Sequence, residues 1–238
     1  MKSISLFIAA FFSLTVSFAQ SADDIISKHI DAIGGKDNWK KLTSMVQNGT
    51  MSVQGAEIQM KRSIIHNTAA RTDISLMGMT GYQIVTNTEG WSYMPFQGQA
   101  TVEAMTAEQI KDQQEELDIQ GVLIDYAAKG HKAEFIGKED VDGTDCFKVK
   151  MTLKGGKAQT LFIDPATYYI IKAVTVMSAN GQEAEVSTGY SNYQKHASGI
   201  VVPMSTTVPM GPGMNADLTI ESIEVNTNLD ASLFKPAK

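Results

Sequence analysis

The 238-residue sequence is poor in the groups that carry chemistry. It has one cysteine, Cys146, so no disulfide forms within the chain and stability must come from a packed core. None of its four histidines lies at metal-ligand spacing from another histidine or from the cysteine. It lacks the Gly-x-Ser-x-Gly motif of serine hydrolases and the glycine-rich loop that cradles phosphate. Its net charge of −6 and its scattered lysines argue against nucleic acid as a partner. We therefore expect neither an enzyme nor a cofactor.

The first 19 residues read as a secretory signal peptide. Lys2 is followed by an apolar run, and the run ends in a small-x-small site at Ala19. The run is shorter than the roughly 20 apolar residues of a membrane span, so an anchor is the weaker interpretation. We expect residues 1–19 to be removed, with Gln20 as the new N-terminus, and residues 20–238 to form one exported domain. Loss of Lys2 takes the net charge from −6 to −7.

A short helix is predicted at the start of the mature chain. Ser21 and Asp24 have the spacing of a capping box, an isoleucine stripe follows, and Gly34-Gly35 ends the helix. From Thr43 the hydrophobic period changes to two. Residues 56–64 alternate apolar and polar side chains, which is typical of a half-buried antiparallel strand.

Similar strands continue to the C-terminus in hairpin order, about ten or eleven in all. A sheet of that size has to curl or close. The pattern is interrupted by residues 106–130, where Thr106 and Gln109 form a second capping box. We predict two helical pieces there, at 107–118 and 121–128. Their apolar faces need covering, which places them inside or across the mouth of the curl.

Twelve methionines remain after processing, and most lie in the apolar phase of the strands or beside them. The stretch at 78–96, "GMTGYQIVTNTEGWSYMPF", adds four aromatic side chains and only one charge. Flexible, polarizable methionine suits surfaces that repack around variable apolar partners. Ordinary core filling explains the composition equally well.

The order of several short segments resembles the outer-membrane lipoprotein-sorting family, the LolA-like periplasmic proteins of bacteria. The segments are "AIGGKDNWKKLTS", "QMKR", "GMTGYQ", "TEGWSYMPF", "TLFIDPATYYIIK" and "IESIEVNTNLDASLFKP", and they extend over nearly the whole mature chain. The resemblance implies an α+β fold, a single-domain unclosed antiparallel β-barrel with helices as a lid over an apolar cavity. It also implies a periplasmic monomer that binds the acyl chains of a lipoprotein or lipid, with an inner-membrane donor and an outer-membrane acceptor as partners.

Arg62 is the candidate polar residue of the cavity. In LolA an Arg follows Lys in a Lys-Arg-Pro run on a strand that faces the cavity. Lys61 and Arg62 match the first two positions, but Ser63 replaces the proline, which leaves the role of Arg62 open. The alternation turns Arg62 toward the apolar face, where an unpaired charge is costly. We expect a carbonyl or carboxylate of the lid, or the polar end of the ligand, to pair with it.

The period-two phase within each strand, with the assignment between strands taken from the resemblance, predicts the cavity wall. Its members are Met51, Val53, Ile58, Met60, Arg62, Leu76, Met79, Tyr82, Ile84, Trp91 and Tyr93. The predicted lid contacts are Ile110, Leu117, Ile119, Val122, Leu123 and Tyr126. Two other classes stay open at this point: an envelope sensor or accessory domain that binds a lipid without transferring it, and an enzyme whose active site has no known motif.

Overall fold

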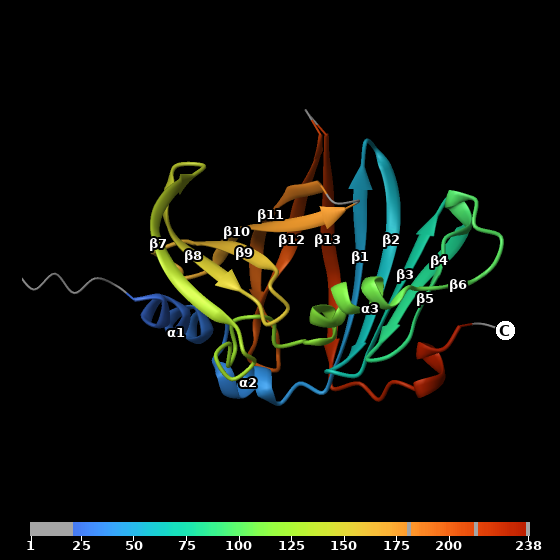
Figure 1. The fold of residues 1–238 in the computed structure, drawn as a ribbon, viewed down its shortest axis with the longest axis horizontal. Helices are drawn as coiled ribbons and strands as arrows, with labels where there is room; N and C mark the ends of the chain where they lie inside the picture. The colour runs from blue at the N-terminus through green and yellow to red at the C-terminus, as the bar shows by residue number, and fades with distance from the viewer. Residues whose placement is uncertain (1–20, 180–181, 212–213, 237–238) are drawn as a thin grey trace, which may run out of the picture.

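The protein is built around one large antiparallel β-sheet that curls without closing (Figure 1). The computed structural model describes residues 21–179, 182–211 and 214–236. The strands lie in the order β6-β5-β4-β3-β2-β1-β13-β12-β11-β10-β9-β8-β7. Their bounds are β1 (Ser44–Val53), β2 (Ala56–Ile65), β3 (Ala69–Leu76), β4 (Met79–Thr86), β5 (Gly90–Tyr93), β6 (Glu103–Ala104), β7 (Lys132–Val141), β8 (Thr144–Thr152), β9 (Ala158–Ile163), β10 (Ile170–Ala179), β11 (Gln182–Lys195), β12 (Val201–Gly211) and β13 (Met214–Val225).

The first and last strands meet at the centre of the sheet. β1 pairs with β2 on one side and with β13 on the other. From β1 the chain moves outward to the edge strand β6, and from the opposite edge strand β7 it returns inward to β13. Residues 105–131 join the two edges, and we call them the crossing segment. Because the edges lie at opposite ends of the sheet, this segment has to traverse it, and in Figure 1 it is the green chain that includes helix α3.

Two helices precede the sheet. α1 (Ala22–Ala32) begins with the predicted capping box, in which the Ser21 hydroxyl accepts from the backbone N–H of Asp24 at 3.1 Å. α2 (Lys36–Lys40) follows directly, and its Trp39 indole donates to the carbonyl of Ile33 at 2.9 Å. Both helices pack on one face of the sheet together with the crossing segment. We call this the inner face.

Strand alternation is confirmed where the sequence pattern is strong. In β2 the side chains of Glu57, Gln59 and Lys61 are exposed, and those between them are half-buried. In β8 and just after it, the sequence alternates Phe147, Val149, Met151 and Leu153 with polar residues, and all four apolar side chains are buried, with Val149 and Met151 both 0% exposed. These phases orient the two halves of the sheet toward one inner face.

The inner face holds two clusters of buried side chains. The first lies over the middle strands and joins Trp39 of α2 and Leu117 of the crossing segment to Met45 and Ile64. The second lies over β8, β9 and β10 and joins them to α1 and to Leu123. The crossing segment contributes to both clusters, so it links the two halves of the core.

Two secondary-structure expectations are corrected. The sheet has thirteen strands rather than ten or eleven; β6 has only two residues, too few to show a period. The crossing segment contains α3 (Ala107–Asp112) and a 3₁₀ turn, η2 (Gln114–Leu117), but the predicted helix at 121–128 is wrong. Gly121 and Asp125 have φ values of 70° and 53°, which a right-handed helix does not accept.

Candidate ligand-binding site

A pocket of about 290 Å³ lies between the inner face of the sheet and the crossing segment. Residues 119–124 form one wall. His29 of α1, Ile33 just after α1 and Trp39 of α2 also line the pocket, and strands β9 to β12 form the opposite wall. The walls are mostly apolar. The polar side chains are His29, Gln120, Gln159, Tyr190 and Tyr193. Few polar groups on an apolar surface are typical of small-molecule sites.

The crossing segment is held on the inner face by apolar side chains along most of its length. Of the predicted lid residues, Leu117, Ile119 and Leu123 are buried, with Leu117 only 1% exposed, and Ile110, Val122 and Tyr126 are half-buried. Ile119, Val122 and Leu123 also line the pocket. The part before Gly121 is therefore anchored more firmly than its charged sequence suggests, because Leu117 lies fully inside the first cluster.

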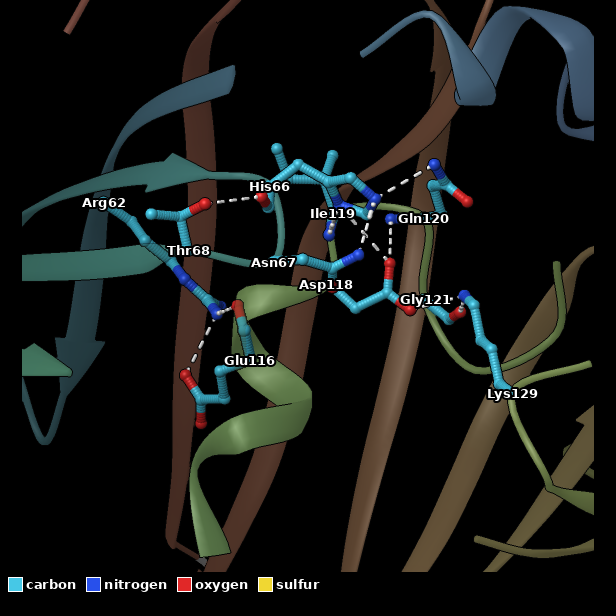
Figure 2. A network of polar contacts seen from close by, with 10 residues as sticks. All are labelled: Arg62, His66, Asn67, Thr68, Glu116, Asp118, Ile119, Gln120, Gly121 and Lys129. Atoms are coloured by element: carbon cyan, nitrogen blue, oxygen red, sulfur yellow. Dashed lines mark hydrogen bonds and ion pairs between the residues drawn. The ribbon is translucent and has the colours of Figure 1, made fainter. Parts of the chain in front are cut away.

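Polar contacts tie the same segment to the hairpin between β2 and β3 (Figure 2). The Arg62 guanidinium donates through Nη2 to the backbone carbonyl of Glu116 at 3.1 Å and to its carboxylate at 3.0 Å. The backbone N–H of Asn67 donates to the carbonyl of Leu117 at 2.7 Å. We call these contacts, with those of His66 below, the polar latch. Arg62 thus has the carbonyl and carboxylate partners that its position in the apolar phase required.

His66 completes the latch. Its Nδ1 accepts from the backbone N–H of Ile119 at 3.3 Å and lies 3.6 Å from a carboxylate oxygen of Asp118 (Figure 2). Burial lowers the pKa of His66, with Asp118 raising it and Lys129 lowering it further. Lys129 forms an ion pair with Asp118 and donates to the carbonyl of Gly121 at 2.7 Å. A neutral His66 suits this arrangement, because only an unprotonated Nδ1 accepts from Ile119.

The predicted cavity wall is divided between two faces of the sheet. Cross-strand partners share a face, and the pairs Met51–Ile58, Met60–Ile74 and Leu76–Met79 belong to the inner face. Seven members therefore lie on that face: Met51, Val53, Ile58, Met60, Arg62, Leu76 and Met79. Their apolar side chains are half-buried or, for Met79, 43% exposed, and none of the seven lines the pocket.

The four aromatic and apolar members from β4 and β5 were assigned to the wrong face. Tyr82 pairs with Tyr93 and Ile84 with Trp91, and the register turns all four away from the inner face. They pack instead against Phe234 of the C-terminal turn η3 (Ala231–Phe234). This turn covers the outer face at that end of the sheet, so both faces of β4 are buried and its sequence does not distinguish them.

Sequence reasoning missed the pocket residues His29, Trp39 and Tyr190. For His29 a signal existed: it lies four residues after Ile25 and three after Ile26, both fully buried, and so belongs to the apolar stripe of α1. Tyr190 has no comparable signal, because only the folded sheet brings β11 near α1.

Other chemistry is sparse. Within residues 21–179, 182–211 and 214–236, no three histidine, cysteine or acidic side chains gather as a metal site would require. Cys146 is buried, and burial raises the pKa of its thiol to about 11, which keeps it protonated. No helix in the described part of the chain is long and apolar enough to cross a membrane.

Comparison with known proteins supports the fold. No protein-family model and no curated sequence matches the chain. Similar crystal structures include a DUF1329 family protein from Desulfovibrio piger, at 13% identity and a TM-score of 0.59 over 91% of this chain and 98% of the other. A LolA superfamily protein from Nitrosomonas europaea has 14% identity and a TM-score of 0.57 over 92% and 99%. A putative outer membrane lipoprotein-sorting protein domain from Vibrio parahaemolyticus has 13% identity and a TM-score of 0.56 over 89% and 94%. The resemblance read from the sequence is thus confirmed for the fold: the chain has the open-sheet architecture shared by these lipoprotein-sorting and LolA superfamily structures.

Proposed function

We propose that the protein is an exported carrier that binds an acyl chain of a lipoprotein or lipid in the pocket under the crossing segment. In this proposal it passes the lipid through the periplasm from an inner-membrane donor to an outer-membrane acceptor. The observation that carries the proposal is the pocket itself, an apolar space whose wall at residues 119–124 is also part of the segment that covers the inner face. The likeness in fold to lipoprotein-sorting structures supports it.

The size of the pocket bears on how a chain enters. At about 290 Å³ it lies at the lower end of the range for ligand pockets, about 300–1,000 Å³. A full acyl chain therefore needs the crossing segment to move outward. Beyond the segment the inner face continues into the half-buried side chains of Met51, Ile58 and Met60, which would extend the apolar surface available to a longer chain.

The free energy lost when the crossing segment is displaced and the free energy gained when an acyl chain is buried are of comparable size. Displacing Leu117, Ile119 and Leu123 exposes side chains whose burial is worth about 1.5–3 kcal/mol each. Burying a chain of about 16 carbons gains roughly 13 kcal/mol before the costs of association, at about 0.8 kcal/mol per methylene. The ligand can therefore replace the contacts that the segment loses. The crossing segment acts in this proposal as the lid, and Arg62 of the polar latch as the group that holds it closed.

Tryptophan fluorescence tests the site directly. Trp39 lines the pocket and Trp91 lies on the outer face, so a Trp91→Phe variant reports from the pocket alone. Titration with palmitic acid or a triacylated lipopeptide should give a saturable change in its emission. The matched Trp39→Phe variant should give none. An unresponsive Trp39, or an equal response from Trp91, would refute binding in this pocket.

Carrier activity needs a second measurement. Protein loaded with a fluorescent lipopeptide is mixed with outer-membrane vesicles, and the label that moves to the vesicles is counted. Transfer is the expected result. Stable retention of the label would instead identify a lipid-binding sensor or accessory domain.

A further inference from the structure

His29 lines the pocket, and its Nε2 atom is a hydrogen-bond acceptor. The side chain of His29 is 4% exposed, and its Nδ1 lies 2.7 Å from the carbonyl oxygen of Tyr168. A carbonyl only accepts, so Nδ1 carries the proton. Burial lowers the pKa of His29, which keeps the ring neutral. Nε2 is then an acceptor, and no described residue donates to it.

A hydrogen-bond donor lines the same pocket. No described residue forms a hydrogen bond with the hydroxyl of Tyr190, although the side chain is largely enclosed and burial raises its pKa. Its neighbour Tyr193 differs, because that hydroxyl donates to the carbonyl of Ile170 at 2.6 Å. The pocket therefore presents the free ring nitrogen of His29 and the free hydroxyl of Tyr190, beside the amide oxygens of Gln120 and Gln159, which also accept no hydrogen bond from a described residue. Leaving such groups unpaired when a ligand excludes water is costly.

We infer that the pocket recognises a single-chain amphiphile that ends in a hydroxyl or un-ionised carboxyl group. The terminal O–H of the ligand donates to Nε2 of His29, and an oxygen of the same end accepts from the hydroxyl of Tyr190. The alkyl chain contacts the apolar walls. This inference rests on the proposed function, since it requires an apolar ligand in the pocket. It narrows that ligand from a lipoprotein or lipid to a free single-chain lipid, and it adds that the polar end of the ligand lies toward α1.

A pair of probes isolates the contact with His29. 1-Decanol and methyl decyl ether share a decyl chain and an ether or hydroxyl oxygen, but only the alcohol has an O–H to donate. Both titrations use the Trp91→Phe protein with Trp39 as the reporter. We expect the alcohol to bind about tenfold more tightly, which corresponds to about 1.4 kcal/mol.

Variants then separate the two polar groups. In His29→Leu the alcohol and the ether should bind with nearly equal affinity, because the acceptor is gone. In Tyr190→Phe both probes should weaken by a similar factor, because both have an oxygen that accepts from the tyrosine. Tyr193→Phe is the matched control, and it should preserve the tenfold preference, since its hydroxyl is already used within the protein.

The outcomes can be told apart even if a pocket variant, such as His29→Leu, does not fold. Equal affinity of the two probes for the Trp91→Phe protein overturns the inference and leaves the proposed function standing. Binding of neither probe overturns the inference, and the palmitic acid titration described above then decides whether the proposed function also fails. Where His29→Leu does not fold, the ¹⁵N signal of His29 Nε2 provides the second measurement. It should move on addition of decanol and stay in place on addition of the ether, and the same response to both probes would again refute the contact.

Discussion

Truncating Leu117 tests whether the crossing segment moves independently of the sheet. This side chain is 1% exposed and lies in the first core cluster, packed with residues of β1 to β4. Leu117→Ala removes its branched end and leaves a cavity, which for buried leucines costs about 2–5 kcal/mol. The loss can lower the free energy of global unfolding, or it can lower only the free energy of a local opening of the crossing segment.

Native-state hydrogen exchange distinguishes the two. If the segment opens by itself, amides whose bonds depend on it should exchange faster, by roughly thirtyfold or more for a loss of 2 kcal/mol. These are the amides of Asn67, which donates to Leu117, and of Asp118 and Gly121 within the segment. The paired amides of β8 and β9 should keep their protection.

Ile163→Ala is the matched control. Ile163 is 0% exposed and belongs to the second cluster, on β9, and it does not line the pocket, so its truncation leaves a cavity in the core under the sheet alone. This variant should accelerate exchange in the sheet and in the crossing segment together. The same exchange profile for both variants would show that the segment is a fixed plug that completes the core, and the reasoning for a lid would fail.

Three further predictions concern the polar latch, the pH dependence of stability and the close approach of two backbone segments at Gly34. Arg62→Leu should release bound lipid faster, and it should lower the unfolding free energy by no more than about 1–2 kcal/mol, because the ion pair of Arg62 with Glu116 is partly exposed. Stopped-flow fluorescence measures the release rate and urea unfolding measures the free energy. An unchanged release rate removes Arg62 from the mechanism. The unfolding free energy should fall as the pH drops below about 6.5, because folding lowers the pKa of His29 and the unfolded chain therefore binds the proton first. The dependence of the unfolding free energy on pH should be weaker in His29→Gln. The same pH dependence in that variant would contradict a buried, neutral His29. Gly34→Ala should destabilise more than Gly35→Ala in thermal unfolding, since both have positive φ but only at Gly34 would a Cβ lie 2.1 Å from a backbone oxygen, so equal losses would argue against that close approach.

Local signals in the sequence predicted local structure well. The capping boxes at Ser21 and Thr106 both form, and Thr106 accepts from the backbone N–H of Gln109 at 3.2 Å. The alternation in β2 and β8 gave the correct phase within each strand. In these cases the determining groups lie within a few residues of one another, so the sequence contains the whole interaction.

The failures have long-range causes. Residues 121–128 have helical spacing of apolar side chains, yet the chain turns at Asp125, whose carboxylate is paired with both Lys36 and Lys40 of α2. The reversed phase of β4 and β5 depends on Phe234, more than 140 residues later, which buries their second face. A pattern of apolar residues reports that a side chain is covered, and it does not report what covers it.

The candidate site was the least predictable part. Three of the six predicted lid contacts, Ile119, Val122 and Leu123, line the pocket, and the opening of the crossing segment as a lid stays a prediction. The polar groups of the pocket were not predicted, because His29 and Tyr190 are far apart in the sequence and neither forms a motif with its own neighbours. Only the closing of β11 toward α1 places them on one pocket.

The central position of β1 and β13 has a consequence for how the protein folds. β1 to β6 form one run of sequential hairpins and β7 to β12 form another, and β13 is the strand that joins them. Met45 pairs with Val225, so this seam requires almost the whole chain. Each run can assemble from contacts between neighbours, but the seam closes a very long loop, which is slow. We therefore expect the two half-sheets to form first and the inner face to become continuous only in the last step of folding. A chain that lacks its final strand would still have the crossing segment in contact with both core clusters, but it would have no backbone pairing between its two half-sheets.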